Sequence, residues 1–299
     1  SIKLITSYII DAWIEGKNKA KELAEKQEKE ALKKEEKPSV VKEKKSESSI
    51  KPKKKISKKK GSAAASFVKT VCDRKFGVGA DGALLLEKSK KADIRMRIFN
   101  ADGSEAEMCG NGARSTALYW VHQSARASEH QKKLKIETKA GIIEAQVTKD
   151  TVKIKLTDPK EYQKKIPLVI RGRKLKANFI NTGVPHTIVF VQGIKQIDAP
   201  NIGREMRYHK YFSPAGTNVN FVEALNNNTI KVRTYERGVE DETLACGTGS
   251  AASAIVFSLQ SRVSGQIKIN VITQGKETLK VYFKKDADRI SDVWLEGKA

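Results

Sequence analysis

Apolar and polar residues alternate along several short stretches of the chain from about residue 65 onward. In ADIRMRIFNADGS, residues 92–104, Ile94, Met96 and Ile98 fall on one face, and Arg95 and Arg97 fall on the other. A period of two residues is typical of a strand with one buried face. The same alternation predicts strands in TVKIKLTD (151–158), TIVFVQ (187–192), NTIKVRTYERG (228–238) and TLKVYFKKD (278–286).

Two segments that share one sequence pattern interrupt these predicted strands. They are EAEMCGNGARSTALYW, residues 105–120, and ETLACGTGSAASAI, residues 242–255. In each, a Glu lies four residues before a Cys, Gly-x-Gly follows the Cys, and a run of small and apolar residues then predicts a helix. A third, shorter helix is expected at residues 67–73. Such an internal repeat predicts two halves that are built alike.

These patterns together predict an α+β fold. We expect two pseudo-symmetric domains, each a mostly antiparallel β-sheet wrapped around a central helix. The first half should span residues 61–148 and the second residues 149–287. Residues 288–299 are expected to return to the first half.

Residues 1–60 form a leader of different composition. The net charge of the chain is +23, and residues 17–60 contain 18 Lys and 8 Glu. Pairs such as Glu22 and Lys26 favour a solvated helix, whereas the tract at 51–62 has almost nothing to bury and should be disordered. This basic tail is expected either to make weak, salt-dependent contacts with nucleic acid or an anionic membrane, or to be a spacer.

The first 16 residues are apolar but too short to span a membrane, and Lys3 and Asp11 interrupt them. They suggest a docking or interfacial helix. No signal peptide is evident, and Ser1 in place of Met suggests a chain cut from a longer one. Three cysteines without a pairing framework fit a reducing compartment, so a cytoplasmic location is expected. Cys72 is expected to be a buried apolar residue.

The two repeated cysteines carry the candidate chemistry. Each precedes a helix N-terminus, whose unpaired N–H groups stabilise negative charge and should lower a thiol pKa from about 8.5 toward neutrality. The same amides can hold a carboxylate. If Cys109 and Cys246 face each other, one thiolate can remove a proton from a carbon while the opposite thiol donates one, which inverts a stereocentre. Taken singly, either Cys-Gly-x-Gly could instead be a tight turn or a close helix contact.

No other chemistry stands out in the sequence. It has no metal-spaced cluster of His and Cys, no dinucleotide fingerprint and no P-loop. Neither a cofactor nor a metal is therefore expected.

Several long motifs in a fixed order add a resemblance to a known family. They are FGVGADG (76–82), FNADGSEAEMCGNGAR (99–114), PHTIVFV (185–191), GTNVNFV (216–222) and YERGVEDETLACGTG (235–249). From about Phe67 to its end the chain resembles the diaminopimelate epimerase family. That resemblance implies a cofactor-independent isomerase that interconverts LL- and meso-diaminopimelate, on the route to lysine and the bacterial cell wall. It also suggests a homodimer.

The resemblance implies a role for each matching residue. The acid and base would be Cys109 and Cys246. Amides at the two helix starts would hold the reacting carboxylate: Gly110, Asn111, Gly247 and Thr248. The remaining substrate contacts would be Glu236 and Arg237 for amino and carboxylate groups, Asn100 and Asn218 for the distal centre, and His186 on the substrate side.

Each polar residue also has a structural interpretation. Asn100 precedes Ala-Asp-Gly and could be a turn residue. Glu236 and Arg237 could form a solvated pair at a strand end, and a lone His such as His186 is often a satisfied structural residue.

Three departures from the family pattern keep other functions open. No Gly-Asn-Asp-Phe-like loop precedes CDRKFGVGADG, and Val184 stands where the family often has a substrate-binding Asn. The sequence also stops at WLEGKA, where the resemblance implies one more short strand that returns to the first domain. One alternative is a proline racemase-like enzyme of the same fold. The other is a catalytically impaired epimerase-like module that its basic tail tethers to polyanions.

Overall fold

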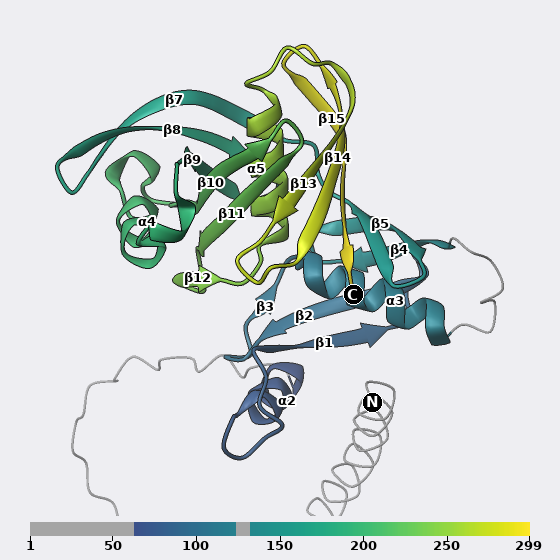
Figure 1. The fold of residues 1–299 in the computed structure, drawn as a ribbon. Helices are drawn as coiled ribbons and strands as arrows, with labels where there is room; N and C mark the ends of the chain where they lie inside the picture. The colour runs from purple at the N-terminus through teal and green to yellow at the C-terminus, as the bar shows by residue number, and fades with distance from the viewer. Residues whose placement is uncertain (1–62, 124–131) are drawn as a thin grey trace, which may run out of the picture. The chain divides into compact units, whose positions relative to one another are not determined.

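A computed structural model describes residues 63–123 and 132–299, and the predicted leader at 1–60 lies outside them. Four helices and fifteen strands are present in these two ranges (Figure 1). The first half contains α2 (Ala63–Cys72), β1 (Gly82–Glu87), β2 (Ile94–Asn100), β3 (Glu105–Ala106), α3 (Gly110–Gln123), β4 (Lys132–Thr138), β5 (Gly141–Thr148) and β6 (Thr151–Lys155).

The rest of the chain contains the longer second half. Its elements are β7 (Lys160–Ile170), β8 (Arg173–Asn181), β9 (Pro185–Phe190), the 3₁₀ turn η1 (Ile194–Gln196), α4 (Ala199–Arg207), η2 (Lys210–Phe212), β10 (Asn218–Asn226), β11 (Thr229–Glu236), β12 (Asp241–Thr243), α5 (Gly247–Ser258), β13 (Gly265–Ile272), β14 (Thr278–Asp286) and β15 (Arg289–Lys298).

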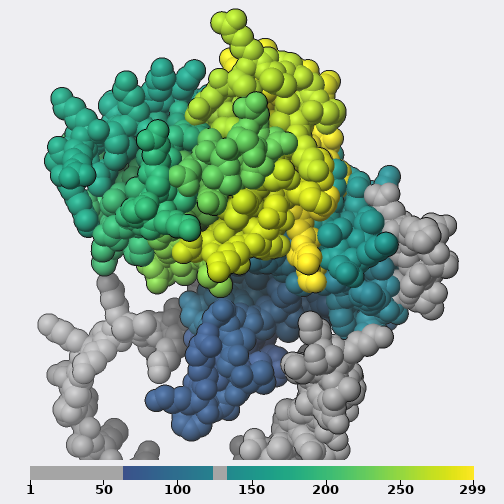
Figure 2. Space-filling model, in the orientation of Figure 1, coloured from purple at the N-terminus to yellow at the C-terminus, as the bar shows by residue number. Residues whose placement is uncertain are grey.

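The strands of both halves are hydrogen-bonded in one continuous order. It runs β1-β2-β4-β5-β6-β15-β14-β13-β11-β10-β9-β8-β7, with β3 beside β2 and β12 beside β11. The last strand, β15, joins the halves, because it pairs with β14 on one side and with β6 on the other. In Figure 2 the yellow atoms of this strand accordingly reach the teal atoms of the first half.

The two halves repeat the same arrangement. Phe99 pairs with Ala83 and Glu105, and Tyr235 pairs with Val219 and Glu242 in the same way. Therefore β1, β2, β3, α3, β4, β5 and β6 correspond to β10, β11, β12, α5, β13, β14 and β15. Helices α2 and α4 both precede and contact the first of these strand pairs.

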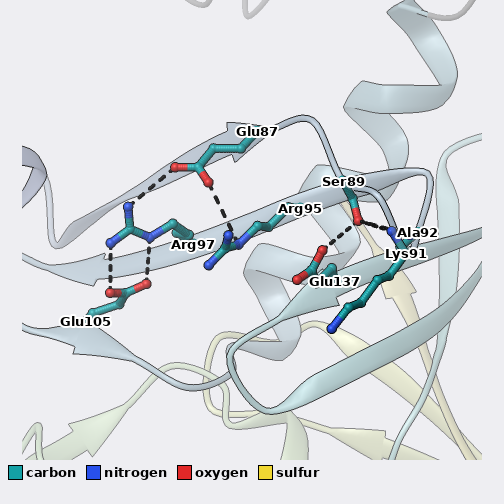
Figure 3. Close-up of polar contacts among 8 residues, drawn as sticks. All are labelled: Glu87, Ser89, Lys91, Ala92, Arg95, Arg97, Glu105 and Glu137. Carbon is teal, nitrogen blue, oxygen red and sulfur yellow. Dashed lines mark hydrogen bonds and ion pairs between the residues drawn. The ribbon is translucent and has the colours of Figure 1, made fainter.

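A partly buried ion pair recurs at equivalent positions of the two halves. Arg97 donates from Nε and Nη2 to both oxygens of Glu105, at 2.8 and 2.9 Å (Figure 3). Arg233 does the same to Glu242, at 2.6 and 2.7 Å. A bidentate pair fixes both position and direction. Each pair thus ties a central strand to the short strand that leads into the cysteine turn.

Three strands of the second half, β7, β8 and β9, have no counterpart among the described residues of the first. Strand β9 lies parallel to β10, with Asn220 opposite Ile188 and Val222 opposite Phe190. Asn220 and Val222 are fully buried, whereas their counterparts on β1, Leu84 and Leu86, are 38% and 37% exposed. Strand β1 therefore forms one end of the described sheet.

The central helices are built from small residues, which allows sheet strands to approach them closely. Ala251, Ala252 and Ala254 of α5 and Ala113 and Ala117 of α3 are completely buried in one hydrophobic cluster. The end of α5 is held by Lys285, whose Nζ donates to the carbonyls of Ser258 and Ser261, each at 2.6 Å. A cation there satisfies carbonyls that the helix leaves unpaired.

The α+β class and the repeated halves are confirmed. The alternation at 94–100 is observed as β2, with Ile94, Met96 and Ile98 buried. The first short helix starts at Ala63 rather than at residue 67. Helix α4 was not predicted, although Asp198 caps its start by accepting from Asn201 and a Pro follows. The domain boundaries given above remain a proposal, although β6 (Thr151–Lys155), which pairs with β5, is grouped here with the first half and not with the predicted second one.

Candidate active site

Both cysteine turns line one cavity of about 980 Å³. Strands, loops and helix starts of both halves line it. Of the site residues expected from the sequence, those that line it are Asn100, Cys109, Gly110, Asn111, Asn218, Glu236, Arg237, Cys246, Gly247 and Thr248. The cavity brings together residues that are up to half the chain apart, and every predicted site residue except His186 reaches it.

The first cysteine turn is the more open of the two. Cys109 is half-buried, and its sulfur accepts the N–H of Gly112 at 3.4 Å. The next helical hydrogen bond runs from Ala113 N–H to the Cys109 carbonyl. The N–H groups of Gly110 and Asn111 have no acceptor within the helix, because the first turn of a helix lacks one. They are available to a ligand.

The second turn has the same backbone arrangement. Cys246 is the extended N-cap residue of α5, and the first helical hydrogen bond runs from Ser250 to its carbonyl. The N–H of Gly249 points to the sulfur, as that of Gly112 does in the first turn. The amides of Gly247 and Thr248 are left without helical acceptors. The two turns thus present four N–H groups to one cavity.

A single leucine separates the two helix starts. A Cβ placed on Gly110 would lie 3.9 Å from Cδ2 of Leu295, and one placed on Gly247 would lie only 2.9 Å from the same atom. Leu295 is fully buried on β15. Glycine at the start of α5 is therefore required for this close approach, whereas the start of α3 has room for a methyl group.

The thiol of Cys246 differs from the sequence expectation. Burial of the thiol and the nearby carboxylate of Glu236 raise the pKa of Cys246 to about 12, although the Thr248 hydroxyl and the Gly249 N–H oppose this rise. The expectation that the helix start lowers this pKa is wrong. Desolvation and a like charge outweigh the helix dipole here, and in the ligand-free protein Cys246 is a protonated thiol.

Glu236 ends β11 at the wall of the cavity. Burial raises the pKa of its carboxyl, and hydrogen-bonding groups of Thr243 and Cys246 oppose the rise. Its counterpart in the first half is Asn100, which also ends a strand. The two cysteine turns therefore have different neighbours, a carboxyl on one side and a neutral amide on the other.

His186, predicted to be on the substrate side, lies behind the cavity wall and does not line the cavity. The residue is fully buried, and its Nε2 lies 3.0 Å from the hydroxyl of Thr248. Burial and the positive charge of Arg237 lower its pKa to about 3. The ring is thus neutral, and it reaches the cavity only through Thr248.

A buried hydrogen-bond chain fixes the orientation of this ring. Thr234 donates to Oδ1 of Asn220 at 2.9 Å, so Nδ2 of that amide faces His186 Nδ1, at 3.1 Å. Nδ1 then accepts, and Nε2 carries the proton and donates to Thr248. The Thr248 hydroxyl, 3.6 Å from the Cys246 sulfur, is free to donate to it. This series of hydrogen bonds ends at Cys246, where the Thr248 hydroxyl is a donor that can stabilise a thiolate.

Asn218 and Arg237 form one structural unit. The Asn218 amide donates to the Pro185 carbonyl at 3.0 Å and accepts the Arg237 N–H at 2.8 Å. The Arg237 guanidinium donates to the Ala215 carbonyl at 3.1 Å. Both residues line the cavity, and Arg237 places its remaining donors there.

Asn100 takes part in a turn and also lines the cavity. Its Nδ2 donates to Ser104 Oγ at 2.9 Å, and its carbonyl accepts from Gly103. The structural interpretation of this residue is therefore correct, and its carboxamide oxygen remains available to a ligand.

Two residues beside the site were not predicted from the sequence. Asn220 holds His186, and Arg114 of α3 is 3% exposed beside the Cys109 turn. The signal for Arg114 was a lone charged residue within a small, apolar helix. For Asn220 it was a polar residue that alternates with Val219 and Phe221 in a buried strand.

Two general findings concern the same described ranges. No helix in them is long and apolar enough to cross a membrane. In residues 63–123 and 132–299, no three His, Cys, Asp or Glu side chains are grouped so that they could hold a metal ion.

Solved structures share this architecture. A hydroxyproline epimerase from Agrobacterium vitis, with bound trans-4-hydroxy-L-proline, matches with a TM-score of 0.59 at 15% identity, covering 77% of this chain and 76% of that one. A phenazine biosynthesis protein of the PhzF family from Bacillus anthracis matches with a TM-score of 0.56 at 21% identity, covering 74% and 82%. The fold is thus that of a class of two-repeat proteins that includes an epimerase.

Sequence comparison is more specific. The sequence model of diaminopimelate epimerase matches residues 54–161 and 178–296. The diaminopimelate epimerase of Aquifex aeolicus is 42% identical over 244 residues, which cover 80% of this chain and 84% of that protein. The enzyme of Archaeoglobus fulgidus is 45% identical over 221 residues, covering 70% and 76%. The chain belongs to the diaminopimelate epimerase family and is an isomerase, as its motifs predicted.

Proposed function

We propose that this protein interconverts LL- and meso-diaminopimelate with Cys109 and Cys246 as the two proton-transferring groups. The observation that carries the proposal is that each repeat places one cysteine at a helix start, and both starts open into one cavity. Named relatives at 42% and 45% identity support this choice of substrate.

The mechanism follows from the different surroundings of the thiols. Cys246, with its raised pKa, holds a proton in the resting protein. Cys109 then acts first as the base: its thiolate takes the α-proton from one face, and the Cys246 thiol donates its proton to the other. The products are the inverted stereocentre, a Cys109 thiol and a Cys246 thiolate. The hydroxyl of Thr248 stabilises that second thiolate.

The helix starts lower the barrier to proton removal. An α-proton beside a carboxylate is a weak acid, because its removal places a second negative charge on the same group. The N–H groups of Gly110, Asn111, Gly247 and Thr248 would hold this carboxylate and stabilise the developing charge. Glu236 would bind an ammonium group, and Arg237 a carboxylate as a bidentate fork.

The test is proton NMR of LL-diaminopimelate in D2O under reducing conditions. Loss of the α-proton signal together with appearance of the meso form is the expected result. C109A and C246A should each abolish turnover, whereas C72A should retain it because Cys72, the last residue of α2, is buried in a cluster with Phe99 of β2, outside the cavity. Epimerisation at the wild-type rate by C109A or C246A would contradict the mechanism.

Two alternatives have specific observations in their favour. The likeness to a hydroxyproline epimerase favours a proline racemase-like enzyme, and turnover of proline but not of diaminopimelate would establish it. Val184 in the cavity wall and the uncovered Leu84 favour a module with impaired catalysis. A folded chain that exchanges no α-proton would support that module.

The setting of the enzyme is also proposed. We infer a reducing, cytoplasmic location, because all three cysteines are free thiols. A homodimer follows only from the family resemblance, and light scattering would test it. Weak binding of the basic leader to nucleic acid or an anionic membrane should decline steeply with salt and disappear when residues 1–60 are deleted.

A further inference from the structure

The two ends of the described sheet differ in their protection against further pairing. Strand β7, at one end, contains Lys164, Lys165 and Pro167, and its register with β8 is interrupted twice. Lysines, prolines and bulges keep an edge strand from pairing with another chain. Strand β1, with the sequence GALLLE at the other end, has no Lys or Pro, and its register with β2 is unbroken. This edge is therefore suited to receive a strand.

The backbone of β1 has hydrogen-bonding groups on its outer side. The Asp81 carbonyl accepts the Ala101 N–H at 3.2 Å, so the backbone of Asp81 faces β2. Successive residues of a strand face opposite sides, so the N–H and C=O groups of Gly82, Leu84 and Leu86 point away from β2. Among the described residues, no strand pairs with β1 on that side.

The second half shows what fills the equivalent position. There the Val222 carbonyl, at the position of Leu86, accepts the Val191 N–H at 2.9 Å. Strand β9 runs parallel to β10, and its residues 186–189 are all buried. The cover of this edge is thus a parallel strand that has both faces buried.

Two side chains of the second half also hold the turn that follows β9. Nη1 of Arg233 donates to the carbonyls of Ile194 and Ile197, at 2.9 and 2.7 Å. The carboxylate of Glu223 accepts the N–H of Gly193 at 2.6 Å. A guanidinium therefore binds carbonyls of this turn, and a carboxylate binds its N–H groups.

The first half has the same two side chains at the equivalent positions. Arg97 and Glu87 correspond to Arg233 and Glu223. Here Nη1 of Arg97 donates to Glu87 at 3.4 Å, and Glu87 also lies 3.8 Å from Arg95 (Figure 3). Contacts of this length between partly exposed charges contribute little. Both side chains can therefore exchange these contacts for those of a docked turn.

The residues directly before α2 do not have the chemistry of this cover. Helix α2 and strand β1 start as many residues apart as α4 and β10 do. By this spacing, residues 49–61, SIKPKKKISKKKG, correspond to residues 185–197, PHTIVFVQGIKQI. The former contain seven Lys, and Pro52 stands in the place of the buried Ile188. Burial of unpaired ammonium groups is costly, and Pro lacks the N–H that a strand needs.

We propose that the β1 edge is a docking site for an extended segment of another polypeptide, which adds to the sheet as a strand parallel to β1. The segment is apolar on both faces, and the turn that follows it binds Arg97 through carbonyls and Glu87 through N–H groups. Main-chain hydrogen bonds to Gly82, Leu84 and Leu86 contribute affinity. Gly82 and Leu84 also line the active-site cavity, so the bound strand lies at its rim.

A second copy of this edge is a poorer partner. Two β1 strands related by a twofold axis would run antiparallel. No turn would then reach Arg97 and Glu87, and both side chains would keep their present contacts. The direction of β9 in the second half and the repeated side chains both favour a parallel strand instead.

The probe is a synthetic peptide with the sequence of residues 185–197, and its control contains the same residues in scrambled order. Hydrogen–deuterium exchange of the full chain is followed by mass spectrometry. Saturating probe should slow exchange of the Leu84 and Leu86 amides at least about tenfold, and the scrambled peptide should not. The amides of β10 should not change, because β9 already covers them. Exchange of β1 that is equal with and without the probe would overturn the proposal.

Variants test the two side chains that bind the turn. R97M and E87M should each weaken probe binding about tenfold, because each removes charge-assisted hydrogen bonds. R289M is the control, since Arg289 is exposed at the start of β15, and it should bind as wild type does. E87M guards against a folding defect in R97M, which also loses the pair with Glu105. Wild-type affinity in folded E87M would contradict the proposal.

The register of the bound strand separates docking from unspecific apolar contact. Phe190 lies opposite Val222 in the second half, so position 190 of the probe should lie opposite Leu86. L86C should form a disulfide in air with a probe that carries F190C, and not with one that carries P185C. Equal reaction with both probes would count against a defined site.

Exchange of the free protein tests the other occupants. The Leu84 and Leu86 amides should exchange quickly without the probe at every protein concentration. Protection that is independent of concentration would assign the edge to the chain's own leader, and protection that rises with concentration would assign it to a second copy. Either result would overturn docking of another polypeptide.

Discussion

The carboxyl of Glu236 and the thiol of Cys246 are neighbours: the carboxylate opposes ionisation of the thiol, and a hydrogen bond from the thiol favours the carboxylate. The Glu236 carboxylate contributes to the raised pKa of Cys246, and burial also raises the pKa of Glu236 itself. Two buried acids in contact cannot both lose their protons without a large cost. The proton shared by this pair is therefore retained on the second cysteine.

Replacing Glu236 with Gln should release the Cys246 proton more easily. The amide keeps the shape of the side chain but removes the negative charge. The pH at which alkylation of Cys246 by iodoacetamide reaches half its maximal rate, its alkylation midpoint, should therefore move down by about 1–3 pH units. E107Q is the matched control, since Glu107 lines the cavity next to Cys109 and should leave Cys246 unaffected. A midpoint of Cys246 that does not move in E236Q would show that burial alone sets its pKa.

Two equivalent glycines should respond differently to an added methyl group. In G249A the new Cβ would lie 2.4 Å from Oδ1 of the buried Asn220, whereas in G112A it would lie 2.9 Å from a terminal methyl of the half-exposed Leu84. G249A should lower the free energy of unfolding by about 1–3 kcal/mol. G112A should change it by less than about 1 kcal/mol, because Leu84 can move. Urea unfolding of both variants measures this, and equal losses would contradict the difference.

The buried neutral His186 should make the protein sensitive to acid. Its pKa falls from 6.5 to about 3 on folding. Between these values the unfolded chain binds a proton that the folded chain does not, so stability falls as the pH falls below 6.5. The loss should reach about 2 kcal/mol at pH 5. Urea unfolding at pH 7.5, 6 and 5 tests this prediction.

H186Q should be less stable at pH 7.5 but should lose less on acidification than wild type. The matched control is H122Q, because His122 is exposed on α3. Its replacement should not change how the free energy of unfolding depends on pH. If the free energy of unfolding of H186Q falls with pH as steeply as that of wild type, groups other than His186 cause the acid sensitivity.

Mild oxidation should join the two cavity cysteines. Thiols that act on opposite faces of one carbon lie close enough to form a disulfide with little backbone movement. We expect a Cys109–Cys246 bond, with loss of activity that dithiothreitol reverses, in wild type and in C72A alike. Peptide mapping without reductant identifies the bond. A bridge that contains Cys72 would contradict the proposed arrangement of the site.

The local sequence contained much of the fold and the positions of both thiols. The alternation around Met96 is visible because one face of β2 is buried and the other is not. The two cysteine turns are visible because the same Cys-Gly-x-Gly pattern, followed by a run of small and apolar residues, occurs twice. Such features depend on neighbours in sequence, so a sequence pattern can reveal them.

The properties of the site depend on contacts between distant segments. The pKa of Cys246 depends on Glu236, and the neutral state of His186 depends on burial behind Thr248. Neither contact leaves a periodic signal. Helix α4 was missed for a related reason, since its mixed sequence, APNIGREMR, is organised by packing of Gly203 against Tyr235.

The position of β15 also determines when the active site can form during synthesis. This strand is made after both cysteine turns, yet it supplies Leu295 between the two helix starts and the Lys298 carbonyl that Arg114 binds. Pairing of β15 with β6 closes a long loop of chain, a slow step for any sheet. A ribosome-bound chain that lacks β15 therefore contains both cysteines without the contacts that place them. Catalytic competence is acquired only when β15 is added, and not gradually as the chain grows.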